Sequence, residues 1–112
     1  MTVNITEVPD NWKIVKFSEE LYKVYATWKG SYLGEERWRM NSGILKVYQD
    51  DTHYYFEGYS GSCYKCCKRA YGIASPYGVD LLQRIIELYP LTVEVLEDRE
   101  DWTKLNDEIV YT

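Results

Sequence analysis

The stretch WKIVKFSEELYKVYATW, residues 12–28, is the part of the chain that most strongly determines the fold. Its first run divides its apolar side chains between two faces, with Trp12 and Ile14 on one and Val15 and Phe17 on the other. Its second run places four apolar side chains on a single face: Tyr22, Val24, Ala26 and Trp28. A period of two in aromatic and β-branched residues is typical of strands. Because the intervening SEE reads as a turn, we predict a β-hairpin.

The same alternation continues through the first two thirds of the sequence. It predicts four further strands, at residues 36–40, 44–48, 53–58 and 63–71. The segments between them are rich in turn residues: NSG (41–43), QDD (49–51) and GYSGS (58–62). Turns this short join antiparallel neighbours, since parallel neighbours need a long crossover. A last strand, LTVEVL, is predicted at 91–96 with Leu91, Val93 and Val95 facing inward.

One helix is predicted between Ser75 and Pro90. Ser75 is placed to cap it, Pro76 suits the first helical turn, and Pro90 ends it. Apolar residues recur at helical spacing along it: Val79, Leu82, Ile86 and Tyr89, with Leu81, Ile85 and Leu88 beside them. An apolar face of this width must lie on another element, and the sheet is the candidate.

These elements predict an α+β fold, with an antiparallel β-meander sheet of five or six strands and one α-helix packed on one face. A length of 112 residues suits a single domain covering residues 1–112. We expect residues 1–10 to form a lead-in and residues 103–112 a tail, both loosely held.

Composition narrows the classes of function. Aromatic residues make up 16% of the chain, with 12 tyrosines, which argues for a folded body rather than a disordered one. The net charge of −5 disfavours nucleic-acid binding, because an acidic surface repels phosphates. No apolar run approaches the roughly 20 residues that span a bilayer. The first residues, MTVNITEVPD, lack the pattern of a secretory signal, so we expect a cytoplasmic protein.

Three cysteines fall in the segment SGSCYKCCKRAYG, residues 60–72. Cys63 and Cys66 have CxxC spacing, but in a continuous strand they point to opposite faces, whereas Cys63 and Cys67 share one. A structural zinc site normally takes four ligands in two separate pairs, and no second CxxC exists. We therefore expect no metal, and interpret the cysteines as free thiols that pack as small hydrophobic residues.

No set of residues in the sequence predicts catalysis or a cofactor. His53 lies near Asp50 and Asp51, but the sequence pairs it with no nucleophile. Ser60-Gly61-Ser62 lacks the lysine and the following helix that a phosphate-binding loop requires. We expect a protein that is not an enzyme.

The tyrosines are the stronger indication of function. One helix covers one face of a sheet, and the other face is then open to solvent or to a partner. Tyrosine is enriched at protein interfaces because it offers a large contact area with a polar end. The candidate interaction surface consists of Tyr22, Tyr25, Tyr48, Tyr55, Tyr59 and Tyr64. The alternative is that these positions are tyrosine because strands favour it.

Two segments, WRMNSGI (38–44) and YYFEGYSGSCYKCCKRAYG (54–72), resemble small proteins encoded by tailed phages, particularly phages of cyanobacteria. The likeness covers about a third of the chain and lies in a Trp–Asn–Ser–Gly turn, an aromatic strand and a Ser-Gly-Ser-x-Tyr-x-Cys segment that ends in Tyr-Gly. Cys66 corresponds to the recurring cysteine of that pattern. The resemblance implies a small accessory protein that binds a macromolecule in the cytosol of the host.

The sequence thus predicts a non-catalytic accessory or inhibitor protein that binds a host protein. The contact would be made by an aromatic sheet face or by the acidic end, EVLEDREDW (94–102), which could alternatively mimic DNA. One alternative is a homodimer formed through the same face. Another is a small β domain that binds single-stranded nucleic acid, with Lys65, Lys68 and Arg69 near Tyr64 and Tyr71.

Overall fold

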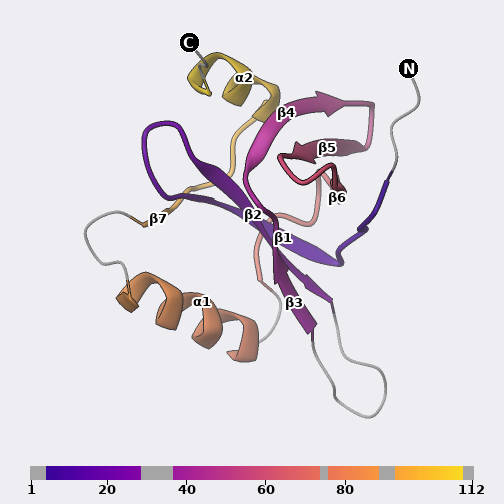
Figure 1. Ribbon diagram of the computed structural model, residues 1–112. Coiled ribbons are helices and arrows are strands. Elements are labelled where there is room, and N and C mark those ends of the chain that lie inside the picture. Colours follow the sequence, from indigo (N-terminus) through magenta and orange to yellow (C-terminus); the bar gives the residue numbers. More distant parts are fainter. Residues whose placement is uncertain (1–4, 29–36, 74–75, 89–92, 110–112) are drawn as a thin grey trace.

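The computed structural model describes residues 5–28, 37–73, 76–88 and 93–109. Within these ranges the chain forms seven strands, two α-helices and one 3-10 helix, η1 (Figure 1). The strands are β1 (Asn11–Lys16), β2 (Tyr22–Trp28), β3 (Arg37–Met40), β4 (Ile44–Gln49), β5 (His53–Gly58), β6 (Cys63–Cys67) and β7 (Glu94–Val95). The helices are α1 (Pro76–Leu88), η1 (Trp102–Lys104) and α2 (Leu105–Glu108).

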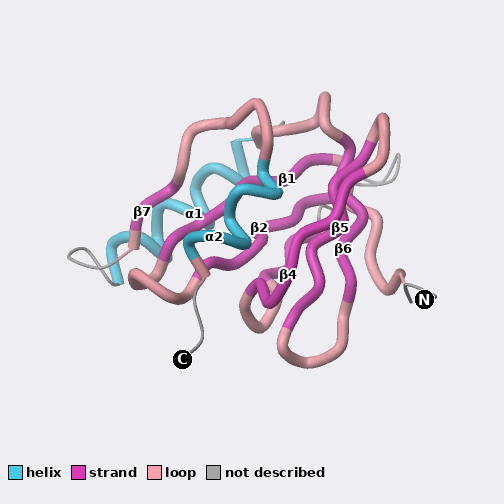
Figure 2. Tube along the Cα trace, turned by 90° about the horizontal axis from the view of Figure 1, so that it is seen from above, coloured by secondary structure: helices cyan, strands magenta, loops and turns pink. Residues whose placement is uncertain are grey.

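The antiparallel α+β fold predicted from the sequence is confirmed, and the strands divide between two sheets. One sheet has the order β3-β2-β1-β7 and the other the order β4-β5-β6, and every strand pair within them is antiparallel. The predicted hairpin is present as β1 and β2, with Ile14 opposite Val24. Figure 2 shows β4, β5 and β6 running together as a group separate from β1 and β2.

The division into two sheets follows from the hairpin, because both of its faces are apolar. Trp12 and Ile14 on one face belong to a core that includes residues of β4, β5 and β6. Val15 on the other face belongs to a second core with Leu82 of α1. A single sheet with one helix would leave one of these faces in water, so the second sheet covers the face that the helix does not.

The core between the two sheets is built on aromatic rings. Trp12 is fully buried, and its ring lies 5.3 Å from Phe56 and 4.7 Å from Tyr71 between ring centroids. The hydroxyl of Tyr71 accepts a hydrogen bond from the Ile14 amide at 3.1 Å and donates one to the Leu96 carbonyl at 2.5 Å. Burial raises the pKa of Tyr71 to about 12, so this hydroxyl remains protonated in neutral solution.

The helix α1 covers the opposite face of the β1–β2 hairpin. Leu82 is buried against this sheet, with Ile85 and Ile86 half-buried beside it. Two residues of the predicted apolar stripe are instead exposed, Val79 by 50% and Leu88 by 72%, because the stripe is wider than the surface that the sheet offers. The predicted cap, Ser75, and the residues Tyr89, Pro90 and Leu91 lie outside the described residues.

The C-terminal segment contributes to the main core, which differs from the loosely held tail expected from the sequence. Trp102 and Leu105 are fully buried and Ile109 is 5% exposed. Their spacing, i, i+3 and i+7, places them on one side of the η1 and α2 turns. Charged neighbours such as Asp101, Asp107 and Glu108 hide this pattern in the sequence. From residue 5 on, where the structure describes it, the predicted lead-in is also held, because the Thr6 amide donates to the Cys63 carbonyl at 3.0 Å.

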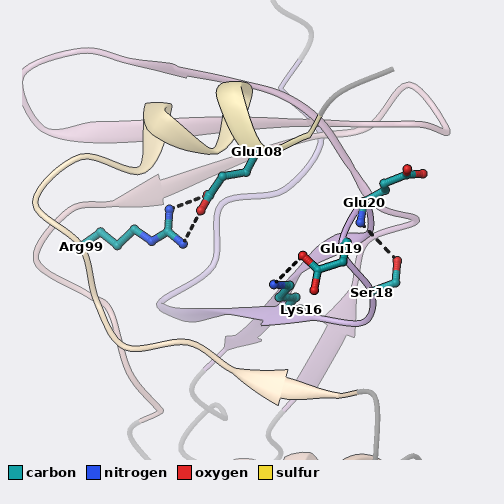
Figure 3. A network of polar contacts seen from close by, with 6 residues as sticks. All are labelled: Lys16, Ser18, Glu19, Glu20, Arg99 and Glu108. Atoms are coloured by element: carbon teal, nitrogen blue, oxygen red, sulfur yellow. Dashed lines mark hydrogen bonds and ion pairs between the residues drawn. The ribbon is translucent and has the colours of Figure 1, made fainter. Parts of the chain in front are cut away.

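An ion pair joins Arg99, before η1, to Glu108 at the end of α2. Arg99 and Glu108 face each other in Figure 3, with Nη1 to Oε2 at 2.6 Å and Nη2 to Oε1 at 3.2 Å. Two parallel contacts of this kind fix orientation as well as charge. The same figure shows the surface pair of Lys16 and Glu19, 3.4 Å apart in the β1–β2 turn.

The outer edge of β4 is paired by a side chain instead of a strand. The Asn106 amide oxygen accepts from the Val47 amide at 2.9 Å, and its amide nitrogen donates to the Val47 carbonyl at 2.9 Å. One asparagine therefore satisfies both main-chain groups of an edge residue. Covering an edge in this way blocks pairing with another chain.

Replacing Asn106 with alanine is expected to lower the free energy of unfolding by about 1 kcal/mol, the usual scale for lost hydrogen bonds that water can partly replace. It should also increase self-association, because the Val47 edge becomes available. Urea unfolding followed by circular dichroism measures the first effect and light scattering the second. Asp107→Ala on the same helix is the control, and an equal effect from both variants would contradict a role for the Asn106–Val47 pairing.

Candidate functional site

The outer face of the three-stranded sheet carries two of the six candidate tyrosines, Tyr48 and Tyr55. Val47, Tyr54 and Phe56 point into the main core, so their neighbours in the strands point away from it. We call this second set the outer face: Lys46, Tyr48, His53, Tyr55, Glu57, Cys63, Lys65 and Cys67. Cys63 is nevertheless buried, with 2% exposure, so the side chains that a partner could reach on this face are the other seven.

Two tyrosines lie side by side at the centre of the outer face. Tyr48 of β4 is directly opposite Tyr55 of β5, and Tyr55 is directly opposite Lys65 of β6. The Tyr48 hydroxyl donates to Oε2 of Glu57 at 2.7 Å, and the Tyr55 hydroxyl donates to Oδ2 of Asp50 at 2.5 Å. Both rings are half-buried by their neighbours. Each tyrosine is therefore held at both its backbone and its hydroxyl end.

Two lysines complete the centre of this face. The Nζ atom of Lys46 lies 5.0 Å from the centroid of the Tyr48 ring, and that of Lys65 lies 5.8 Å from the centroid of the Tyr55 ring. A cation within about 6 Å of a ring face is attracted by it. Lys46 is also opposite Glu57 across the sheet. The positive and negative charges on the face therefore alternate around the two rings.

The protonation states on the outer face are fixed by these hydrogen bonds. The Tyr55 hydroxyl, followed by the amides of Thr52 and His53, lowers the pKa of the Asp50 carboxyl well below its usual range. The same bond raises the pKa of Tyr55, and the bond to Glu57 raises that of Tyr48. At neutral pH the phenols therefore donate, and the Asp50 carboxylate is an ionised acceptor.

The structure places only three of the six candidate tyrosines where a partner could contact them. Tyr48 and Tyr55 lie on the outer face, and Tyr59 is 44% exposed in the turn between β5 and β6. Tyr22, Tyr25 and Tyr64 are buried, with 3%, 0% and 2% exposure, so their assignment to the interaction surface is wrong.

The sequence could not show which of the six tyrosines are buried. Alternation separates the two faces of a strand, but it does not show which face another element covers. Both faces of β2 are covered, so Tyr22 packs between the sheets while Tyr25 packs towards α1 and donates to the Gly78 carbonyl at 2.8 Å. Tyr64 lies on the inner face of β6, where burial raises its pKa to about 12.

The cysteines lie on an extended strand, as predicted, but the strand is shorter than 63–71. It ends at Cys67, because the Ala70 amide turns back to donate to the Cys67 carbonyl at 3.0 Å. Cys66 points into the main core, and Cys63 and Cys67 belong to the outer face. Burial raises the pKa of both Cys63 and Cys66, which keeps these thiols protonated and disfavours the thiolate that a metal or an electrophile needs.

Within the part of the chain that the structure describes, no three His, Cys, Asp or Glu side chains are grouped so that they could hold a metal ion. The acidic end is partly used inside the molecule. Asp98 accepts from the Trp102 indole nitrogen at 2.9 Å, and Asp101 caps η1 by accepting from the Thr103 amide at 2.9 Å. These two carboxylates stabilise the C-terminal segment, which reduces what that end can offer to a partner.

A second feature is an open cavity of about 480 Å³ with both polar and apolar groups in its lining. It lies where the end of β3, the β3–β4 turn and the β5–β6 turn meet the N-terminal segment. Its lining consists of residues 39–42 and 60–62 with Thr6, Glu7 and Tyr64. The sequence indicated NSG and GYSGS only as turns. That both carry serines was visible, but nothing in the sequence showed that the two turns lie side by side.

The comparisons with known proteins add no relative: no protein-family model, no curated protein and no solved structure matches this chain. None of the described helices has the length and apolar character needed to cross a bilayer. What the protein does must therefore be argued from its own residues.

Proposed function

We propose that this chain is a small non-catalytic accessory protein that binds a partner protein through the outer face of β4, β5 and β6. The observation that carries the proposal is the pair of neighbouring tyrosines, Tyr48 and Tyr55, whose hydroxyls are held by Glu57 and Asp50 at 2.7 and 2.5 Å. Following the resemblance to phage proteins, the partner would be a protein of a cyanobacterial host.

Fixed tyrosines suit binding because association costs less entropy when the contacting side chains are already ordered. Tyrosine is also among the residues that most often dominate binding energy at interfaces. Here the two rings stand next to each other in register across β4 and β5. A partner that covers them would meet a rigid aromatic centre with charged groups around it, which is the usual arrangement of a protein interface.

The charges favour a protein over single-stranded nucleic acid as the partner. Lys46 and Lys65 attract phosphates, but the carboxylates of Glu57 and Asp50 are hydrogen-bonded to the same two tyrosines. Of the rings weighed for base stacking, Tyr64 is 2% exposed, and Tyr71 is packed against Trp12 and Trp102. A surface with both signs of charge matches the mixed surface of another protein better than a polyanion.

The test is quantitative capture of proteins from a cyanobacterial lysate with the immobilised wild-type chain and with the double variant Tyr48→Ser/Tyr55→Ser. We expect a partner that the wild type retains and the double variant loses by about tenfold or more, since truncation of a central interface tyrosine commonly has an effect of this size. Both side chains lie outside the hydrophobic cores, so the variant should fold, which circular dichroism checks.

Tyr59→Ser is the matched control, because Tyr59 is exposed but lies in the turn beyond the sheet face. Equal capture by the wild type and the double variant would contradict the proposal. A doubled mass in light scattering that the double variant abolishes would instead identify the face as a homodimer contact. A salt-dependent shift of single-stranded DNA would identify it as a nucleic-acid surface.

A further inference from the structure

We propose that the outer edge of β3 binds an extended peptide segment in which acidic residues alternate with apolar ones, adding it to the sheet as a further antiparallel strand. This edge is separate from the outer face of β4, β5 and β6, so the inference goes beyond the function proposed for that face. It follows from three features of β3: unpaired main-chain groups, two arginines on one side of the sheet and an exposed tryptophan on the other.

The strand β3 lies at the end of the four-stranded sheet, and no described strand pairs with its outer side (Figure 1). The other edges of the described strands are covered or short. Asn106 pairs the edge of β4, and Glu7 pairs that of β6, where its carbonyl accepts from the Lys65 amide at 2.9 Å. The remaining edge strand, β7, has only two residues. An uncovered strand edge is a template for pairing with another chain.

The hydrogen bonds between β2 and the end of β3 show which main-chain groups of β3 face outward. The Asn41 amide, directly after β3, donates to the Val24 carbonyl at 3.2 Å. Hydrogen-bonded pairs alternate along an antiparallel ladder, so the amide and carbonyl groups of Trp38 and Met40 point away from β2. No described residue is bonded to these groups. An added strand would satisfy all of them.

Two arginines give one side of this edge a positive charge. Arg37 and Arg39 alternate with Trp38, so they lie on the same side of the sheet, and both are exposed. The Arg37 guanidinium lies 5.0 Å from the centroid of the Trp28 ring, and no ion pair joins it to a described carboxylate. Arg39 contacts Glu7 through Nη1 at 2.8 Å, which leaves its other donors to a ligand. Acidic side chains on the added strand would pair with these donors.

Trp38 gives the other side of the edge an apolar contact. Its ring stacks on the buried ring of Tyr25, 5.8 Å away between centroids, and is still 41% exposed. Met40 lies on the same side and packs against the core beneath α1. An aromatic ring that is ordered before binding suits recognition of an apolar side chain. The complementary strand is therefore acidic on the arginine side and apolar on the tryptophan side.

A second copy of this chain matches the edge less well than an acidic peptide does. Arg37 would stand opposite Arg39 of the second copy if Trp38 were opposite Trp38. Arg39 would stand opposite Arg39 if Trp38 were opposite Met40. Like charges directly opposite each other destabilise a strand pair. A nucleic acid offers the negative charge but has no alternating amides and carbonyls for the main-chain groups, whereas a peptide strand offers both.

The test is a ¹⁵N–¹H NMR titration of the whole chain with a blocked peptide of three Glu-Val repeats. In the proposed register its valines stand opposite Trp38 and Met40 and its glutamates opposite the arginines. We expect saturable binding at about millimolar concentration or below, with the largest shifts at the Trp38 and Met40 amides. The same peptide methylated on every valine amide should not bind, because these amides face β3. Methylation of every glutamate amide, which faces away, should leave binding intact.

Arg37→Glu should weaken binding of the Glu-Val peptide about fivefold or more, because an attractive cross-strand pair becomes a repulsive one. It should also allow binding of a peptide of three Lys-Val repeats. The Arg37 side chain is exposed, so the variant should fold, which circular dichroism checks. Arg69→Glu is the matched control, because it makes the same change of charge at an exposed position in the turn after β6. It should bind the Glu-Val peptide as the wild type does.

Equal binding of the two methylated peptides, or equal losses in the two arginine variants, would overturn the proposal, because net charge alone would then explain the binding. Absence of peptide shifts far above millimolar concentration would also overturn it. Shifts of the Trp38 and Met40 amides on concentrating the chain without peptide would replace it with self-association. Shifts with single-stranded DNA and none with the peptide would replace it with a nucleic-acid site. No residue of the outer face takes part in this test, so its failure would leave the proposed function standing.

Discussion

Trp102→Ala is expected to lower the free energy of unfolding by about 3–5 kcal/mol, the range found for removing a buried tryptophan or phenylalanine from a core. Trp102 is fully buried, and its ring stacks on Tyr71 at 5.5 Å and meets Trp12 edge-on at 6.1 Å. Its indole nitrogen donates to Asp98 at 2.9 Å, a bond that the substitution also removes. Because a domain of this size is stable by about 5–15 kcal/mol, the variant should be close to unfolding.

Urea unfolding followed by far-ultraviolet circular dichroism measures this loss without relying on tryptophan fluorescence. Trp38→Ala is the control, since Trp38 is 41% exposed and stacks on Tyr25 at 5.8 Å. It should cost about 1–2 kcal/mol, from one aromatic pair and part of its buried area. If the two variants lost equal stability, the Trp102 ring would not contribute to the main core as its burial indicates.

Gly43→Ala is expected to have the next largest effect, a loss of about 2–4 kcal/mol. Gly43 has φ of +141°, a conformation that costs a side-chain-bearing residue about 1–3 kcal/mol. A Cβ at this position would also lie 2.6 Å from the Tyr59 ring and 2.8 Å from the Leu21 side chain. Both must move to admit it, which adds a packing cost. Gly43 lies between β3 and β4, at the point where the chain passes from one sheet to the other.

The structure supplies a control in which the backbone strain is retained and the crowding is absent. Gly72 has φ of +135°, and a Cβ built on it meets no atom within 4 Å. Gly72→Ala should therefore lose only the part that comes from the backbone, and the difference from Gly43→Ala should be about 1–2 kcal/mol. Equal losses in the two urea titrations would show that Tyr59 and Leu21 move aside freely.

Part of the proposed binding surface was predictable from local pattern. Tyr48 and Tyr55 alternate with the core residues Val47, Tyr54 and Phe56, and that alternation is visible in the sequence. The hydrogen-bond partners of these tyrosines were not predictable, because Glu57 of β5 and Asp50 of the β4–β5 turn reach the two hydroxyls only when β4 and β5 are in register. The cavity was not predictable at all, since Ser42 and Ser60 are brought together by a contact between two turns that are 18 residues apart.

Local patterns of side chains were sufficient to identify the β1–β2 hairpin, the strands β4 and β5, the helix α1 and the extended course of residues 63–67. These features depend on interactions between residues close in the chain, whose period is written directly into the order of amino acids. Whether a face is buried depends instead on what other elements leave uncovered. The second sheet covers one face of the hairpin, and for this reason Tyr22 and Tyr64 belong to the main core. Trp102 completes the same core. Which faces are buried depends on how much apolar surface the whole fold removes from water. This is a property of the packed molecule, and the sequence of a single segment does not contain it.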